Sequence, residues 1–167
     1  MPISGTMTTG PRLAFVGCEI SAGASAGAGG GSGQAQAHGR REVVVSGKRV
    51  KTIDVHAHCI VPEAAQLINH PLEAPGLLWS NIGDRLAQMD HTGVDVEALS
   101  INPYWYRAER DAVAEVIRVQ NEALVAFCAS QPDRFVAFAT AALQYPDLAA
   151  AQVEQAVKTL GFRGIGV

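Results

Sequence analysis

The chain has 167 residues, of which 48% are hydrophobic, and its formal net charge is −3 at pH 7. This length and composition suffice for a buried core, and no apolar run approaches the roughly 20 residues that a membrane-spanning helix needs. Lys and Arg are scattered along the chain rather than clustered, which gives no basic patch for nucleic acid. We therefore expect a folded protein that binds neither membranes nor nucleic acid.

The first 41 residues differ in kind from the rest of the chain. Residues 21–37 read SAGASAGAGGGSGQAQA, a low-complexity sequence with too little apolar surface to fold. A weakly apolar stretch precedes it, and the final Ala-Gln-Ala matches the cleavage pattern of an export signal. We expect 1–41 to be a low-complexity tail or degenerate signal segment, followed by one domain over 42–167. The predicted location is cytoplasmic, with export through the N-terminal segment as the alternative.

Strands and helices alternate through the predicted domain. A β-hairpin is expected around the turn Ser46-Gly47-Lys48, and it leads into a strand that ends in two histidines. The further elements that we expect are helices over 62–69, from 82 to a stop at Gly93, up to Pro132 and over 147–160, and strands over 94–101, 135–140 and 162–167. This alternation is typical of βαβ units around a parallel sheet whose strands are buried on both faces. A complete (β/α)8 barrel takes about 250 residues. The sequence therefore predicts an α/β fold, a partial TIM-type barrel comprising roughly its first half.

Two histidines, His56 and His58, stand one residue apart at the end of this β-branched strand. Side chains two residues apart leave the same face of a strand, so both imidazoles can reach one divalent metal, with Ile53 and Val55 expected to face a core. Barrel enzymes place their active sites at this carboxyl end of the strands. We predict that both histidines are ligands of one divalent metal, zinc or a related ion. The alternative is that they are ordinary core or surface histidines, because a catalytic site needs three or more protein ligands and two are visible.

Two neighbours of the histidines have expected structural roles. Asp54 lies two residues before His56, so we expect it on the same face but deeper, where it holds an imidazole or a backbone amide in place. Cys59 points to the opposite face and is expected to be a small buried hydrophobic residue.

Three stretches of the chain carry a resemblance to a known family. They are IDVHAH at 53–58, RLAQMDHTGVDVEALS at 85–100, and QPDRFVAFATAALQYPDLAA at 131–150 leading into LGFRGIGV at 160–167. In order and spacing they resemble the amidohydrolase superfamily, in particular the branch related to aminocarboxymuconate-semialdehyde decarboxylase. The resemblance implies a distorted barrel, one catalytic divalent metal that is typically zinc, and decarboxylation or hydrolysis of a small carboxylic or cyclic substrate. It places His56 and His58 at the first two ligand positions, and it leads us to expect the other ligands and the catalytic acid/base beyond Val167.

The loop that follows the second barrel strand should open at the same carboxyl end. Tyr104 and Trp105 offer aromatic surface for an unsaturated or aromatic acid, and Arg107 offers a bidentate partner for a carboxylate. We therefore predict that these three residues bind substrate; the alternative is that the aromatic side chains only pack the loop against the next helix. Of the other histidines, His91 is expected to be solvated, and His70 to lie on a loop surface or over the mouth of the active site.

Taken together, these features predict a metal-dependent decarboxylase or hydrolase of a small carboxylic acid, represented by its N-terminal half. The alternative is a non-catalytic half-barrel that needs a partner chain or self-association to cover its apolar faces, and a homo-oligomer is possible.

Overall fold

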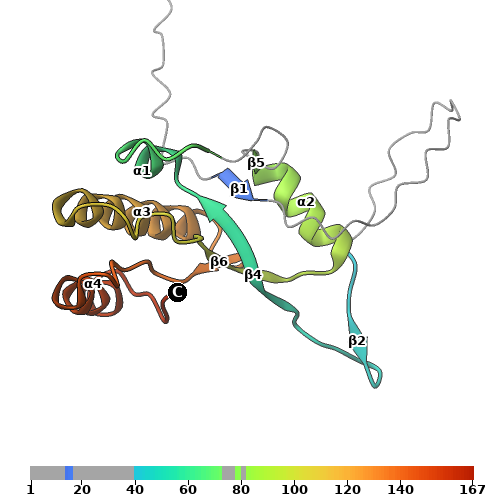
Figure 1. Cartoon of the computed structure of the whole chain (residues 1–167). Helices are drawn as coiled ribbons and strands as arrows, with labels where there is room; N and C mark the ends of the chain where they lie inside the picture. The colour runs from blue at the N-terminus through green and yellow to red at the C-terminus, as the bar shows by residue number, and fades with distance from the viewer. Residues whose placement is uncertain (1–13, 17–39, 73–77, 80–81) are drawn as a thin grey trace, which may run out of the picture.

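A computed structural model describes residues 14–16, 40–72, 78–79 and 82–167 of the chain (Figure 1). Five strands form the main sheet, in the order β5-β1-β4-β6-β7. Their bounds are β1 Ala14–Val16, β4 Ile53–Ile60, β5 Leu78–Trp79, β6 Val96–Ser100 and β7 Phe135–Ala137. The four helices in the described residues are α1 Pro62–Gln66, α2 Ile82–Thr92, α3 Arg110–Ser130 and α4 Pro146–Lys158.

The barrel-type part of the sheet consists of parallel strands joined by helices. β4 pairs in parallel with β6, and β6 with β7, while a parallel bridge between Ala139 and Ile165 continues the same order. Each crossover carries a helix, as βαβ geometry requires. The predicted α/β fold of a partial barrel is thus confirmed, although the strand expected over 162–167 amounts to that single bridge.

The core lies between the strands and the helices. Figure 1 shows α1, α3 and α4 side by side as one layer. Residues from one face of β4 and β6 pack into this core together with apolar residues of the helices. They include Ala57, Cys59, Leu99, Met89, Val113, Val116, Ile117 and Leu124, all at most 1% exposed. Cys59 is therefore the small buried residue that its position predicted.

A β-bulge changes which residues of β4 face this core. Asp54 is level with Glu97 and Ala57 is level with Leu99, so two residues of β4 stand opposite one residue of β6. Because the bulge inverts the alternation, Asp54 shares the helix-covered face with Ala57 instead of the face of the histidines. The expectation that Ile53 and Val55 face a core was wrong, since they are 56% and 68% exposed.

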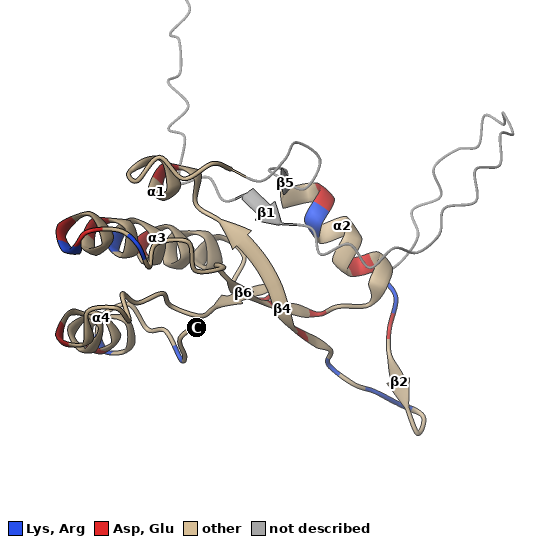
Figure 2. Ribbon diagram, viewed as in Figure 1, with Lys and Arg blue, Asp and Glu red and all other residues tan. Residues whose placement is uncertain are grey.

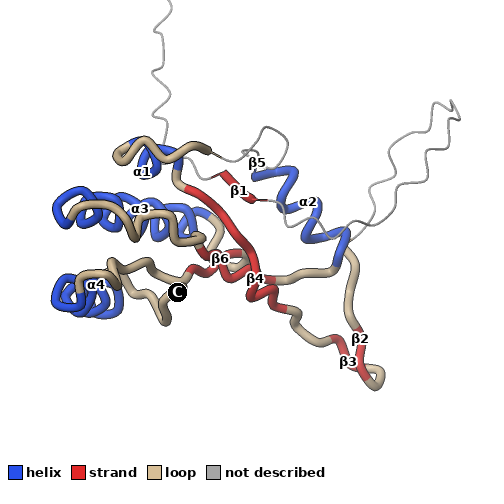
Figure 3. Tube along the Cα trace, viewed as in Figure 1, coloured by secondary structure: helices blue, strands red, loops and turns tan. Residues whose placement is uncertain are grey.

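Two short antiparallel strand pairs accompany the parallel strands: one is a separate hairpin, and the other extends the sheet beside β4. The predicted hairpin is present as β2 Val44–Val45 and β3 Lys48–Arg49, and it projects away from the sheet (Figure 3). The sequence did not predict β1, which pairs antiparallel with β4 at Ile60 and Cys59 and with β5 on its other side. Apart from residues 14–16 and 40–41, the expected tail, including the possible cleavage pattern at residues 35–37, lies outside the described residues.

A cluster of polar contacts around Asp95 joins the hairpin to the end of α2. Asp95, whose side chain is 7% exposed, accepts a hydrogen bond from the Thr52 amide at 2.7 Å and pairs with Arg40 and Arg49 at 2.6 and 2.5 Å. The Thr52 amide and the two guanidinium groups, working against desolvation, lower the pKa of Asp95 to about 2. Gly93, at φ +83°, ends α2 immediately before this cluster, as the sequence predicted.

Acidic and basic residues are interspersed along the described elements, as the ribbon of Figure 2 shows. None of the helices in this part of the chain is long and apolar enough to cross a membrane.

Candidate metal centre and substrate loop

The two predicted metal ligands lie side by side on the face of β4 that points away from the helices of the described residues. The ring centroids of His56 and His58 are 4.6 Å apart, with the rings at 80° to each other. His56 is the second of the two bulge residues and His58 follows the bulge, and both rings lie on one face of the strand. The sequence prediction that the two imidazoles stand together is consistent with this geometry, and their role as ligands remains a prediction.

His58 has a partner on the neighbouring strand that fixes the orientation of its ring. Ser100 is level with His58 in the parallel ladder, and its Oγ lies 3.0 Å from His58 Nδ1. This contact leaves Nε2 as the imidazole nitrogen that faces away from the protein partner. Sequence reasoning missed Ser100, although the parity of the two strands could have identified it once their register was known.

The surroundings of His58 favour its neutral form. Burial lowers the pKa of His58, and the neighbouring His56 lowers it further, while Ser100 and Asp54 act in the opposite direction. A neutral imidazole is the form that binds a metal ion. The chemistry of this pair therefore fits two positions of a metal site.

Asp54 supports the histidine pair through the backbone. Its Oδ1 accepts a hydrogen bond from the His56 amide at 2.8 Å. Of the two roles that the sequence left open for Asp54, the structure shows the contact with a backbone amide. This contact spans the bulge, so it helps to fix the strand where the two imidazoles begin.

Within the described residues, no group of three or more His, Cys, Asp or Glu side chains is placed to hold a metal ion. His91 lies exposed in the last turn of α2, as expected for a solvated residue. His70 stacks on Tyr104 with ring centroids 4.4 Å apart and an interplanar angle of 15°. The described residues thus supply two candidate ligands and no third.

The loop between β6 and α3 holds the three residues that the sequence predicted for substrate binding. Trp105 is 1% exposed, and its indole N–H donates to the Ala141 carbonyl at 3.1 Å. Its indole is thus committed to packing, which is the alternative considered from the sequence and argues against contact with a substrate. Tyr104 is half-buried, and Arg107 is exposed.

Tyr104 is held by buried polar residues of α3 and of the segment that follows β7. Gln120 Nε2 donates to the Tyr104 hydroxyl at 2.8 Å, and the fully buried Gln120 accepts from Thr140 Oγ1 at 2.9 Å. Burial raises the pKa of Tyr104 to about 12, against the effect of Gln120, so its hydroxyl stays protonated. Sequence reasoning missed Gln120 because a glutamine on a helix gives no sign of being buried.

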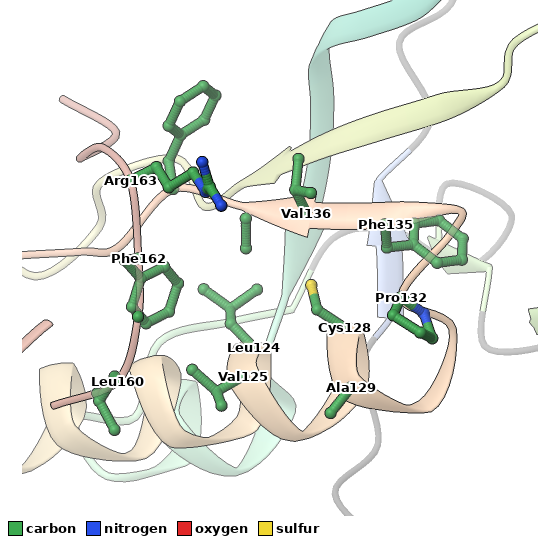
Figure 4. A pocket seen from close by; sticks show the side chains of 13 residues that line it. Leu124, Val125, Cys128, Ala129, Pro132, Phe135, Val136, Leu160, Phe162 and Arg163 are labelled. Atoms are coloured by element: carbon green, nitrogen blue, oxygen red, sulfur yellow. The ribbon is translucent and has the colours of Figure 1, made fainter. Parts of the chain in front are cut away.

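An apolar cavity lies on the helix side of β7. It has a volume of about 340 Å³ and is lined by apolar side chains of α3, β7 and residues 160–162, with Arg163 beside them. Figure 4 shows Leu124 and Cys128 reaching from α3 toward β7 and Phe162 closing one side. His56 and His58 are not among its lining residues, so this cavity is separate from the candidate metal centre.

Comparison with known proteins identifies one family for most of the domain. A family model described as amidohydrolase matches residues 53–167, a stretch that begins at the first residue of β4.

Gamma-resorcylate decarboxylases from bacteria are similar in sequence to this chain. The gamma-resorcylate decarboxylase of Rhizobium radiobacter is 33% identical over 122 residues, which cover 67% of this chain and 37% of the relative. The gamma-resorcylate decarboxylase of a Polaromonas species is 39% identical over 82 residues, covering 48% of this chain and 25% of the relative. The chain therefore spans little more than a third of the length of the first of these relatives.

Solved structures of related proteins also match about two thirds of this chain and little more than a third of their own length. A 2,6-dihydroxybenzoate decarboxylase in complex with 2,6-dihydroxybenzoate superposes with a TM-score of 0.53 at 30% identity, covering 68% of this chain and 37% of that protein. A Polaromonas dihydroxybenzoic acid decarboxylase with bound manganese and the inhibitor 2-nitroresorcinol gives 0.52 at 27% identity, covering 69% and 37%. A proposed amidohydrolase from Staphylococcus aureus gives 0.60 at 25% identity, covering 70% and 36%.

Proposed function

This chain belongs to the amidohydrolase family, and we propose that it forms the metal-binding N-terminal part of a decarboxylase that acts on aromatic carboxylic acids. The observation that carries the proposal is the pair His56 and His58, placed side by side where the parallel pairing of β4 with β6 ends, in a chain 33% identical over 122 residues to a gamma-resorcylate decarboxylase. Hydrolysis of a small carboxylic substrate is the second activity that the family membership leaves open.

In this proposal the two imidazoles hold a divalent metal ion, and the remaining ligands come from parts of the barrel other than the described residues. When bound, such an ion supplies electrophilic polarisation of a substrate oxygen. Ser100 fixes the ring of His58 so that Nε2 is available, and Asp54 fixes the backbone at His56. Zinc is our prediction from the sequence, and manganese is the ion named for a related decarboxylase.

The metal assignment is tested by titrating the purified chain with Zn²⁺ and with Mn²⁺ in a calorimeter. We expect weak saturable binding, because two imidazoles make an incomplete site. His56→Ala and His58→Ala should each abolish it. His91→Ala is the matched control, since it removes an exposed histidine on α2. Saturable binding that survives both substitutions would contradict the assignment.

The reaction is tested by a chimera in which residues 53–167 replace the matching segment of the Rhizobium gamma-resorcylate decarboxylase. We expect metal-dependent release of carbon dioxide from 2,6-dihydroxybenzoate, and its loss in the His56→Ala and His58→Ala chimeras. A folded chimera that binds metal but hydrolyses an ester or amide instead of releasing carbon dioxide would favour the hydrolase.

A further inference from the structure

A second, smaller cavity opens at the carboxyl ends of β4 and β6. It has a volume of about 210 Å³. Its lining residues are Cys59, Ile60, His70, Ile101, Asn102, Pro103 and Tyr104. Cys59 and Ile60 directly follow His58, so the cavity lies next to the candidate metal centre along the strand. Ligand cavities for drug-sized molecules measure about 300–1,000 Å³, and this smaller volume suits a single ring.

One wall of the cavity is formed by two stacked rings, those of His70 and Tyr104. His70 lies on Tyr104 at an interplanar angle of 15°, and the Tyr104 hydroxyl is hydrogen-bonded to the buried Gln120. The backbone amide of His70 donates to the Ala65 carbonyl at 2.9 Å, which ties the loop to α1. The Tyr104 ring is therefore fixed at its hydroxyl, and His70 is fixed at its backbone and stacks on that ring.

The polar groups that line the cavity differ in their hydrogen bonding. The hydroxyl of Tyr104 is engaged with Gln120, whereas the imidazole nitrogens of His70 and the carboxamide of Asn102 make no hydrogen bond with any residue in the described ranges. Ile60, Ile101 and Pro103 supply the apolar remainder. A cavity lined by apolar side chains together with polar groups that have no hydrogen-bond partner among the described residues has the usual composition of a small-molecule site.

We propose that His70 is a specificity-determining residue for the ring of an aromatic carboxylic acid, which stacks against the His70–Tyr104 pair and hydrogen-bonds through its polar substituents to His70 and Asn102. The class of ligand rests on the proposed function. The site itself rests on the stacked pair and the two unused polar side chains. A planar ring extends the existing stack, whereas a puckered aliphatic ring of the same size does not match it.

The test uses the whole 167-residue chain in the presence of EDTA, so that binding at this cavity is measured without a metal ion. The probes are 2,6-dihydroxybenzoate and cyclohexanecarboxylate, which share a carboxylate but differ in planarity and in ring hydroxyls. Dissociation constants come from NMR titrations that follow the amide signals of Asn102 and Tyr104. The variants are His70→Ala, His70→Phe, which keeps a ring but no nitrogen, and His91→Ala as the matched control.

We expect His70→Ala to weaken binding of 2,6-dihydroxybenzoate about fivefold to tenfold, as the loss of one aromatic pair and one hydrogen bond implies. His70→Phe should lose less, His91→Ala should lose nothing, and cyclohexanecarboxylate should bind weakly to all variants. The proposal is overturned if the unaltered chain shows no saturable binding of the aromatic acid, or if His70→Ala binds it as the unaltered chain does. Failure of metal binding at His56 and His58 would sink the proposed function and leave this result unaffected, so the two failures are distinguishable.

Discussion

The thiols of Cys59 and Cys128 lie in different surroundings. Cys59 is 1% exposed on the core face of β4, and its Sγ lies 3.6 Å from the Ser100 carbonyl. Burial raises the pKa of its thiol far above the usual range, whereas burial of the half-buried Cys128 raises its pKa to about 11. The reacting species in alkylation is the thiolate, so both effects slow the reaction, and Cys59 is affected more.

We therefore expect iodoacetamide to modify Cys128 in the native protein at a measurable rate and to leave Cys59 unmodified. Mass spectrometry of tryptic peptides after timed exposure measures both rates. In urea the two cysteines should react alike, which is the control for peptide recovery. Native-state labelling of Cys59 as fast as that of Cys128 would show that the end of β4 opens frequently.

At the scale of elements, Asp95 connects three segments that the sequence separates. It binds the Thr52 amide before β4 and the guanidinium groups of Arg40 and Arg49, and it follows directly on the end of α2. The ionised carboxylate is the form that these donors stabilise, which is why the pKa of Asp95 is about 2 in the folded chain.

The pH dependence of this cluster follows from that depressed pKa. A folded-state pKa below the unfolded value means that the contribution of Asp95 to stability is complete above the unfolded pKa, near 3.8, and is lost as the pH falls through about 2. Asp95→Asn should therefore lower the free energy of unfolding at pH 7, and its difference from the unaltered chain should shrink between about pH 4 and pH 2.

Urea denaturation followed by circular dichroism at several pH values measures this difference. Asp133→Asn is the matched control, because Asp133 is an exposed aspartate. A difference between Asp95→Asn and the unaltered chain that is the same at pH 7 and pH 2.5 would contradict the role of the ionised carboxylate.

At the scale of the whole molecule, the described helices cover one face of the sheet and leave apolar side chains exposed on the other. Ile53, Val55 and Val136 are 56%, 68% and 47% exposed, and Val136 is level with Ala98 on the same side as Ser100 and His58. Exposed apolar side chains clustered on one sheet face mark a surface that another element or molecule covers.

We expect the chain to self-associate in a concentration-dependent way through this face, measurable by sedimentation velocity. Replacing Val55 and Val136 together by Thr should shift the distribution toward the monomer, because Thr keeps the branched shape and adds a hydroxyl that is costly to bury. Replacing Val157, which is exposed on α4, is the control. A monomer at all concentrations would contradict self-association through this face.

The sequence predicted most of the fold because long apolar periodicities specify it. α2, α3 and α4 lie close to their expected bounds, since each has a glycine or proline that limits it. The sequence could not predict β1, whose three residues have meaning only through their pairing with β4. It could not predict that Ile53 and Val55 are exposed either. A bulge shifts the alternation of side chains by one residue, and a strand of eight residues is too short for that shift to be visible in the sequence.

The candidate site was predictable in part. The spacing of His56 and His58 alone indicates a shared face, and their rings do lie together. Trp105 and Tyr104 are neighbours of the same chemical kind, yet one is buried against Ala141 and the other borders a cavity. That difference arises from the path of the loop, which the composition of the loop does not reveal.

The bulge in β4 has a consequence for how this strand tolerates changes in length. Because the alternation restarts at the extra residue, the phase of His56 and His58 is set locally and not by the segment that leads from the hairpin. Insertions or deletions before Ile53 can be absorbed there without turning the imidazoles toward the helices. Deleting Val55 would close the bulge and leave a regular ladder in which Ala57 and His58 still stand level with Leu99 and Ser100, so the face of His58 would not change.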